Sequence, residues 1–260
     1  MRMINPNGLS TDKEYFADEH YMSVSRFKAF EKCEVGAMSD EKYESTSMLV
    51  GSYVDAYISG TLDDFIQEHP EIISSRGKTK GELKADFKVA DEVIAKISND
   101  TVFQQFLSGD KQTVMTGEIS GVPFKIKIDS YSPDKAIVDL KVMASITKRD
   151  GSYFDFITPW GYEVQGAVYQ EIVRQNTGKQ LPFFIAVATK ENPVNTAIIE
   201  IPQVILDRAL YRVESQVERF YQVMQGEIEP IGCGVCSACI KDRKETPIIS
   251  MEDILEGGLI

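Results

Sequence analysis

The chain has 260 residues and a mass of 29.1 kDa; 43% of its residues are hydrophobic and 26% are charged. These values are ordinary for a globular protein, and a chain of this length can bury a core without disulfides. The formal charge of −12 argues against a general polyanion binder, which usually shows a basic face. The apolar runs are too short to span a bilayer, and residues 1–16 lack the apolar core of a secretory signal. We therefore expect a cytoplasmic protein without membrane segments.

The first hundred residues predict mainly helices. A helix through residues 25–33 would be capped by Ser23 or Ser25, and a second follows over residues 45–57. Residues 61–69 predict a short helix with Thr61 as its cap, and residues 81–97 carry apolar side chains at helical spacing. No repeat or low-complexity linker divides the chain. We expect one domain over residues 1–260, with a helical N-terminal portion and a cysteine-containing C-terminal tail.

From Gln112 onward the pattern changes to strands. Strands over 113–119 and 122–129 are joined by a Ser-Gly hairpin turn, and a third strand over 135–141 follows a proline turn. A helix over 159–178 comes next, then strands over 182–189 and 196–201 and a long amphipathic helix over 202–225. This order predicts an α/β or α+β core wrapped by the N-terminal helices.

Two neighbouring strands end in carboxylates, and the second also carries an amine. Because side chains alternate faces along a strand, Asp139 and Lys141 point the same way. A short connection can bring Asp129 and Asp139 within a few ångströms of each other. Two close carboxylates repel unless they share a proton or a cation, and hard cations such as Mg²⁺ prefer oxygen ligands. Such a cation would activate a water for attack on a phosphodiester.

An Asp-x-Lys triplet alone is a weak signal, since it is common on exposed strands. Three further features favour a site. Gln165 and Tyr169 are four residues apart and share a helix face. Glu118 precedes the strand of Asp129 and could add a carboxylate. Asp55 stands on an otherwise apolar helix, where an acid is costly unless it is paired or metal-bound, so it is either a metal ligand or the partner of a lysine.

The order Asp129, Asp139-x-Lys141 and Gln165-x-x-x-Tyr169 resembles the PD-(D/E)xK nuclease superfamily, in its RecB-like branch with the phage RecE-type exonucleases. Residues 23–33, SVSRFKAFEKC, and residues 49–57, LVGSYVDAY, are similar to the opening motifs of those exonucleases. The resemblance covers nearly the whole chain, and the Gln/Tyr helix is its more discriminating part. It implies an α/β fold of the restriction-endonuclease type, in which helices flank a central mixed sheet.

The resemblance also implies roles for single residues. Asp129 and Asp139 would bind Mg²⁺ or Mn²⁺, with the backbone carbonyl of Leu140 as a further ligand. Lys141 would assist the attacking water, with support from Gln165 and Tyr169. Many relatives carry a histidine where this chain has Asp55. Asp55 could hold a second metal, since a carboxylate suits Mg²⁺ better than an imidazole does, or it could be a structural partner for a lysine.

Four cysteines suggest a second cofactor site. Cys233, Cys236 and Cys239 follow the spacing C-x-x-C-x-x-C, which matches the first three ligands of a ferredoxin-type run, and Cys33 is the one cysteine left to act as a fourth. Related CRISPR-associated and AddB-type nucleases similarly place one early and three late cysteines around a four-iron cluster, although their last spacing is usually longer. A [4Fe-4S] cluster is favoured here, with zinc or free thiols as the alternatives.

The function predicted from these features is an Mg²⁺-dependent exonuclease that resects double-stranded DNA ends. The resemblance further implies phage-type recombination with a single-strand annealing protein, and a ring-shaped homo-oligomer around DNA. The alternative is a non-catalytic DNA-binding or assembly protein on the same fold. Candidate DNA contacts are the start of the first helix, where anions are favoured, and the lysines near Asp129. They are Ser25, Arg26, Lys28, Lys125 and Lys127.

Overall fold

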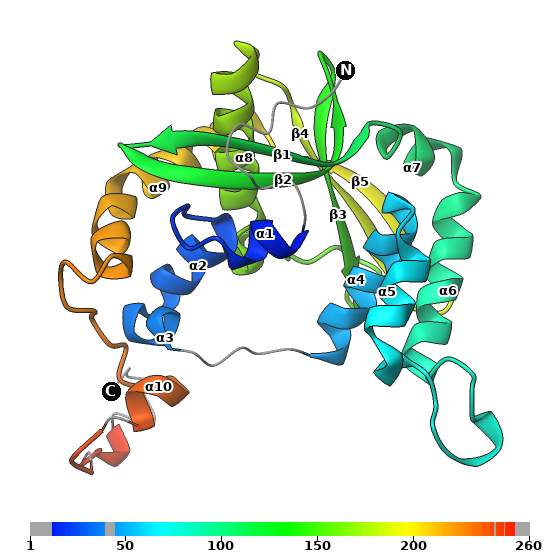
Figure 1. The fold of residues 1–260 in the computed structure, drawn as a ribbon, viewed down its shortest axis with the longest axis horizontal. Helices are drawn as coiled ribbons and strands as arrows, with labels where there is room; N and C mark the ends of the chain where they lie inside the picture. The colour runs from blue at the N-terminus through cyan, green and yellow to red at the C-terminus, as the bar shows by residue number, and fades with distance from the viewer. Residues whose placement is uncertain (1–11, 40–44, 242, 247, 253–260) are drawn as a thin grey trace.

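The computed structural model describes residues 12–39, 45–241, 243–246 and 248–252. A five-stranded sheet in the order β1-β2-β3-β4-β5 runs through the middle of the protein (Figure 1). β3 and β4 are parallel and all other neighbours are antiparallel. The strands are β1 (Asp110–Ile119), β2 (Val122–Ser132), β3 (Ala136–Met143), β4 (Phe183–Thr189) and β5 (Thr196–Glu200). The central mixed sheet predicted from the sequence is confirmed.

Helices cover both faces of this sheet. The predicted helices correspond to α2 (Val24–Lys32), α4 (Thr46–Ser59), α5 (Leu62–Glu68), α6 (Ala85–Ser98), α8 (Tyr162–Thr177) and α9 (Gln203–Met224). Four short helices escaped prediction, because each has fewer than two turns: α1 (Asp12–Ala17), α3 (Glu34–Met38), α7 (Thr101–Phe106) and α10 (Ser237–Lys241). Ser23 caps α2 as expected, whereas Thr61 makes no side-chain cap bond to α5. None of the helices in the described part of the chain is long and apolar enough to cross a membrane.

The sheet separates two hydrophobic cores. One core joins the sheet to α2, α8 and α9, and the other joins it to α4, α6 and α7 (Figure 1). β3 contributes alternate residues to the two cores, with Ile137 in the first and Val138 and Leu140 in the second. Asp139 therefore stands in line with Ile137, toward α8, because side chains alternate along a strand.

The β1–β2 hairpin turns at Ser120 and Gly121, both with positive φ, as the tight hairpin turn requires. On its other side β2 pairs with β3 only as far as Ser130 opposite Val138. Asp129 and Asp139 would be the next opposed pair, but the backbone pairing stops before them. The strands therefore part at the two carboxylates, and we call this place the fork of β2 and β3.

Candidate active site

The fork brings the two predicted acids together. Asp129 Oδ2 accepts a hydrogen bond from the backbone N–H of Leu140 at 2.8 Å, which bridges the strands beyond their last backbone pair. Asp129 and Asp139 are thus held near each other within β2 and β3, at the place where the backbone pairing of the two strands stops. The backbone amide of Leu140, next to Asp139, fixes the orientation of the Asp129 carboxylate.

Asp139 is 2% exposed and is held from two sides. Gln165 Nε2 on α8 donates a hydrogen bond to Asp139 Oδ1 at 2.6 Å. Lys141 Nζ forms an ion pair with Asp139 Oδ2 at 2.5 Å. Beyond that ion pair, Oδ2 makes no hydrogen bond to any described residue. One oxygen of a buried carboxylate therefore retains acceptor capacity that the surrounding side chains leave unused.

Gln112 joins a third carboxylate to the site, a role that no sequence motif indicated. Its Nε2 donates to both oxygens of Asp55 on α4, at 3.0 and 3.1 Å, and approaches Asp129 Oδ1 at 3.5 Å. Gln112 has φ of +50° inside β1, an uncommon conformation for a residue other than glycine. Such local distortion is typical of functional sites. Gln112 thus links Asp55 on α4 to Asp129 on β2.

The charged side chains at the fork shift one another's pKa values. Burial, followed by repulsion from Asp139 and Asp55, raises the pKa of Asp129 well above its ordinary value. Burial alone would lower the pKa of Lys141, but the carboxylates of Asp139 and Asp129 outweigh that effect, and the pKa of Lys141 is raised. Lys141 therefore stays charged beside the acids, and Lys111 adds positive charge near Asp129 and Asp55.

This arrangement fits a divalent cation of the Mg²⁺ type. The donor set consists of carboxylate oxygens, which hard cations prefer, and one of them, Asp139 Oδ2, is buried and short of partners. A bound cation would offset the repulsion from Asp139 and Asp55, which adds to burial in raising the pKa of Asp129. Asp129 and Asp139 are thus the residues best placed to hold it, with the Leu140 carbonyl as the neighbouring backbone donor.

Lys28 lies beside Lys141, so its α2 helix reaches the site. Its Nζ stands 5.7 Å from the ring centre of Tyr162, and Lys141 Nζ stands 5.2 Å from the same ring. Lys28 also donates a hydrogen bond to the carbonyl of Trp160 at 3.0 Å. Burial, with added repulsion from Lys141, lowers the pKa of Lys28 to about 8. The structure therefore brings this predicted DNA contact to the site and adds Tyr162, which the sequence did not indicate.

Two predicted residues lie elsewhere. Glu118 is exposed and stands opposite Pro123, six positions from Asp129 and hence about 20 Å along the strand. The expectation that it adds a ligand at the fork is wrong. Lys125 is 4% exposed, and its Nζ donates to the carbonyls of Tyr15 and Asp18 at the end of α1. It therefore does not line a DNA path, because α1 buries it.

The other candidate residues lie on α8, β2 and α2. Tyr169 is buried and donates a hydrogen bond to the carbonyl of Lys127 at 2.8 Å, so it ties α8 to β2. Lys127 is half-buried, and its Nζ lies 5.5 Å from the ring centre of the exposed Phe16. Ser25 is exposed and Arg26 partly exposed on the first turn of α2. These positions leave their predicted contacts with DNA open to experiment.

The four cysteines meet in space although they are far apart in the sequence. The Sγ atoms of Cys33, Cys233, Cys236 and Cys239 all lie within 4.8 Å of one another. Cys33 Sγ is 3.5 Å from Cys239 Sγ and 3.6 Å from Cys236 Sγ. The cluster joins the end of α2 to the tail around α10 (Figure 1). The expected pairing of one early with three late cysteines is observed.

An ion pair holds the same two segments together. Arg219 on α9 binds both carboxylate oxygens of the buried Glu34 at 2.8 and 2.9 Å. The backbone N–H of Ile231 donates to Glu34 Oε2 at 2.7 Å. Burial opposes ionisation of this acid, but the Arg219 hydrogen bonds dominate, so its pKa is lowered. The tail thus approaches α3 through Glu34 as well as through the cysteines.

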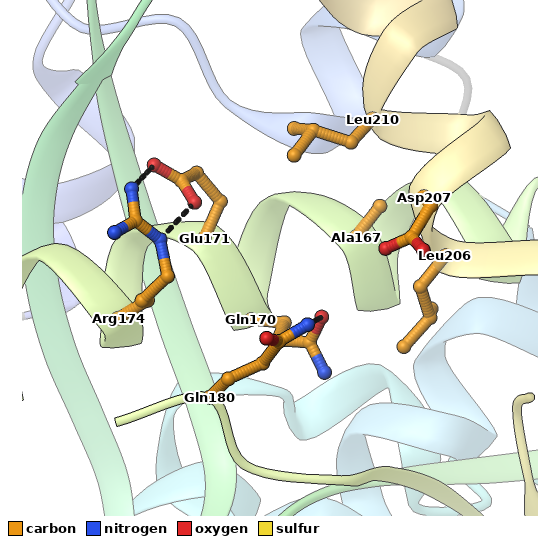
Figure 2. Close-up of a pocket in the computed structure, with 8 residues that line it drawn as sticks. All are labelled: Ala167, Gln170, Glu171, Arg174, Gln180, Leu206, Asp207 and Leu210. Carbon is orange, nitrogen blue, oxygen red and sulfur yellow. Dashed lines mark hydrogen bonds and ion pairs between the residues drawn. The ribbon is translucent and has the colours of Figure 1, made fainter. Parts of the chain in front are cut away.

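A small pocket of about 190 Å³ lies between α8 and α9, away from the fork (Figure 2). None of the acids at the fork lines it, and its polar groups largely satisfy each other; Arg174, for example, forms two hydrogen bonds to Glu171 at 2.7 and 2.8 Å. The pocket is therefore separate from the candidate active site. Its lining residues are Ala167, Gln170, Glu171, Arg174, Gln180, Leu206, Asp207 and Leu210.

A mixed sheet whose forked strands deliver Asp129, Asp139 and Lys141 beneath a glutamine helix defines a nuclease of the PD-(D/E)xK superfamily. The chain belongs to one particular family of this class. The family model for the PDDEXK-like domain of unknown function, DUF3799, matches residues 23–242, which is most of the chain. The resemblance inferred from the sequence motifs is therefore confirmed.

A solved structure extends this assignment. The chain is similar to the crystal structure of a "Putative exonuclease" from Eubacterium rectale, determined at 2.19 Å resolution, with 47% sequence identity and a TM-score of 0.85. The match covers 95% of this chain and 98% of the other. No curated protein matches the chain. The predicted fold, a restriction-endonuclease-like α/β core, is thus confirmed.

Proposed function

We propose that the protein is a metal-dependent exonuclease that degrades double-stranded DNA from an end. The observation that carries this proposal is the meeting of Asp129, Asp139, Lys141 and Gln165 at one fork of the sheet. The name of the Eubacterium rectale protein supports the exonuclease class. A non-catalytic DNA-binding protein on the same fold would have no need for a buried carboxylate beside a charged lysine, since burying charges is costly.

In this proposal each residue at the fork has a chemical task. Asp129 and Asp139 hold Mg²⁺ or Mn²⁺ together with the Leu140 carbonyl, and Gln165 keeps the Asp139 carboxylate in place. When bound there, such a cation would supply a water of lowered pKa for attack on the phosphodiester and positive charge beside the phosphate. Lys141 adds a fixed positive charge for the developing oxyanion. Asp55, which Gln112 orients, is the proposed ligand of a second cation.

A digestion experiment tests the proposal. Linear duplex DNA and the same DNA in closed circular form are incubated with the protein in Mg²⁺, and acid-soluble nucleotides are measured. We expect release from the linear form only, its loss in EDTA, and a loss of about 10²-fold or more in Lys141→Ala, the range found when one transition-state contact is removed. Release that survives both EDTA and Lys141→Ala would reject this site, and no release from the wild-type protein would favour the non-catalytic alternative.

We propose that the four cysteines bind a metal group that anchors the tail to α2. Three of them follow the spacing of a ferredoxin-type run, which favours a [4Fe-4S] cluster. The sulfur separations of 3.5 and 3.6 Å around Cys33 are close to the value of about 3.8 Å that a tetrahedral zinc ion with 2.3 Å bonds would require. Iron and zinc content decides between these two cofactors.

The resemblance to phage RecE-type exonucleases supports a further proposal about partners. Digestion of one strand of a duplex leaves the other strand exposed, and a single-strand annealing protein of phage-type recombination would receive it. A closed ring of identical subunits around the duplex would keep the enzyme on its substrate. The subunit number in solution and the length of product released per binding event, measured with a competitor DNA trap, test the ring.

A further inference from the structure

Trp160, the one tryptophan of the chain, lies next to the candidate active site with an exposed side chain. Trp160 is 59% exposed, although large aromatic side chains are usually buried. Its backbone carbonyl accepts the hydrogen bond of Lys28, whose ammonium faces the same Tyr162 ring as Lys141. The indole is therefore attached to the backbone that forms one edge of the site.

Hydrogen bonds and restricted backbone angles fix the turn that carries Trp160. Asp155 Oδ1 accepts the backbone N–H groups of Ile157 at 2.9 Å and Thr158 at 3.1 Å, which closes the turn before Trp160. Gly161 follows with φ of +60°, and a Cβ added there would lie 2.8 Å from Lys28 Cδ. Glycine thus lets the Lys28 side chain pack against the turn. Proline at position 159 further restricts the backbone.

We propose that Trp160 is a stacking platform for a base of the DNA strand that enters the active site. The inference rests on the proposed function and adds the recognition of a base to it. An exposed indole on a fixed turn offers a flat apolar face, and every base can stack on such a face regardless of sequence. Lys28 beside it supplies positive charge toward the phosphate of the same strand, so base and backbone would be contacted together.

The recognised group is an unpaired base near the strand end. A base inside a duplex already stacks on both of its neighbours, whereas a base at a frayed or separated end has a free face. Stacking on Trp160 would therefore favour separation of the terminal nucleotides from their complement. The chemical class of the ligand is a single-stranded terminal nucleotide with its base intact.

The fluorescence of the single tryptophan reports this contact directly. Two single-stranded oligonucleotides of equal length and charge are titrated into the wild-type protein with Ca²⁺ in place of Mg²⁺. One is a normal strand, and the other lacks the bases of the three nucleotides at each end. We expect the normal strand to quench Trp160 and the abasic-ended strand to quench it much less. Equal quenching by both strands would overturn the proposal.

Affinity measurements on variants complete the test. Trp160→Ala should bind the normal strand about 5- to 100-fold more weakly, the range found for removal of one stacked base, and the abasic-ended strand with unchanged affinity. Tyr211→Ala, which removes an aromatic side chain that is 73% exposed on α9, is the matched control and should bind both strands like the wild type. If Trp160→Ala behaves like the control while the wild type binds and digests DNA, this inference fails and the proposed function stands. If the wild type binds no DNA, both fail.

Discussion

The Asp129 carboxylate accepts the backbone N–H of Leu140 at 2.8 Å, and this bond spans the fork at which β2 and β3 separate. One hydrogen bond therefore aligns an acid of β2 with the backbone on which the second acid stands. Backbone pairing between β2 and β3 stops before Asp129 and Asp139. The hydrogen bond from Leu140 to Asp129 nevertheless keeps the two strands close at this place.

Gln165→Ala should weaken metal binding without unfolding the protein. The amide of Gln165 holds Asp139 Oδ1 at 2.6 Å, and removal of such an orienting partner typically costs about 10- to 100-fold in metal affinity or activity. The measurement is Mn²⁺ affinity by calorimetry. Gln175→Ala is the control, because Gln175 lies on the same helix but bonds the backbone of Glu118 at the far end of β1. Equal losses of Mn²⁺ affinity in both variants would contradict an orienting role.

Asp129→Asn should stabilise the metal-free protein at neutral pH. The pKa of Asp129 is raised in the folded state, mainly by burial, so the native protein holds this proton more tightly than the unfolded chain does. Stability is therefore lost as pH rises through the interval between the unfolded and folded pKa values. Asparagine removes the charge but keeps an oxygen for the Leu140 N–H. We expect a gain of roughly 1–2 kcal/mol in EDTA at pH 7, typical of relieving a strained functional site.

Urea denaturation in EDTA at two pH values checks this prediction. The advantage of Asp129→Asn should shrink as pH falls from the raised folded-state pKa of Asp129 toward its unfolded-state pKa, because the wild-type carboxyl is then protonated in the folded protein. Saturating Mg²⁺ should stabilise the wild type and have little effect on the variant, because a ligand stabilises only the state that binds it. A variant less stable than the wild type at pH 7 without metal would show that the charge of Asp129 is already compensated.

The protein should lose about one charged contact with a DNA phosphate between pH 7 and pH 9. Lys28 has a pKa of about 8, so its charge is present below that value and is lost as pH rises through it. The slope of log Kd against log salt should therefore decrease by about 0.7 to 0.9 at pH 9 relative to pH 7. Lys28→Arg keeps its charge throughout this range and should remove the difference. The same change of slope in Lys28→Arg would exclude Lys28 as its source.

The purified protein should contain metal bound by the four cysteines. Their Sγ atoms lie within 4.8 Å of one another, so four thiolates cannot share this space without a cation. Elemental analysis and visible absorption of anaerobically purified protein are the measurements. We expect iron with broad visible absorption, and its loss in Cys236→Ser with a lower Tm. If the protein contains one zinc per chain and shows no visible absorption, the bound metal is zinc and not an iron-sulfur cluster. If it contains neither iron nor zinc, the proposed metal site is wrong.

Much of the site could be predicted because its residues follow one another in a recognisable order along regular elements. Asp139 and Lys141 lie two apart on one strand, and Gln165 and Tyr169 four apart on one helix. The hairpin turn at Ser120 and Gly121 also fixes the register that places Glu118 far from Asp129. Counting the strand register from this turn is therefore enough to exclude Glu118 as a ligand at the fork.

Other features depend on contacts that no local pattern contains. Gln112 looks like any polar strand residue, and its role arises because α4 carries Asp55 to the edge of β1. Lys125 looks exposed by alternation, but α1 covers it with the carbonyl groups of Tyr15 and Asp18. Lys28 could be placed on a helix but not beside Lys141, since α2 and β3 are more than a hundred residues apart in the sequence.

Anomalous diffraction from crystals soaked in Mn²⁺ tests the central claim most directly. If Asp129 and Asp139 hold a divalent cation at the fork, wild-type crystals should show an anomalous peak in contact with both carboxylates, and Asp139→Asn crystals should lose it. Manganese bound elsewhere in the chain, or a peak that persists unchanged in Asp139→Asn, would contradict the account.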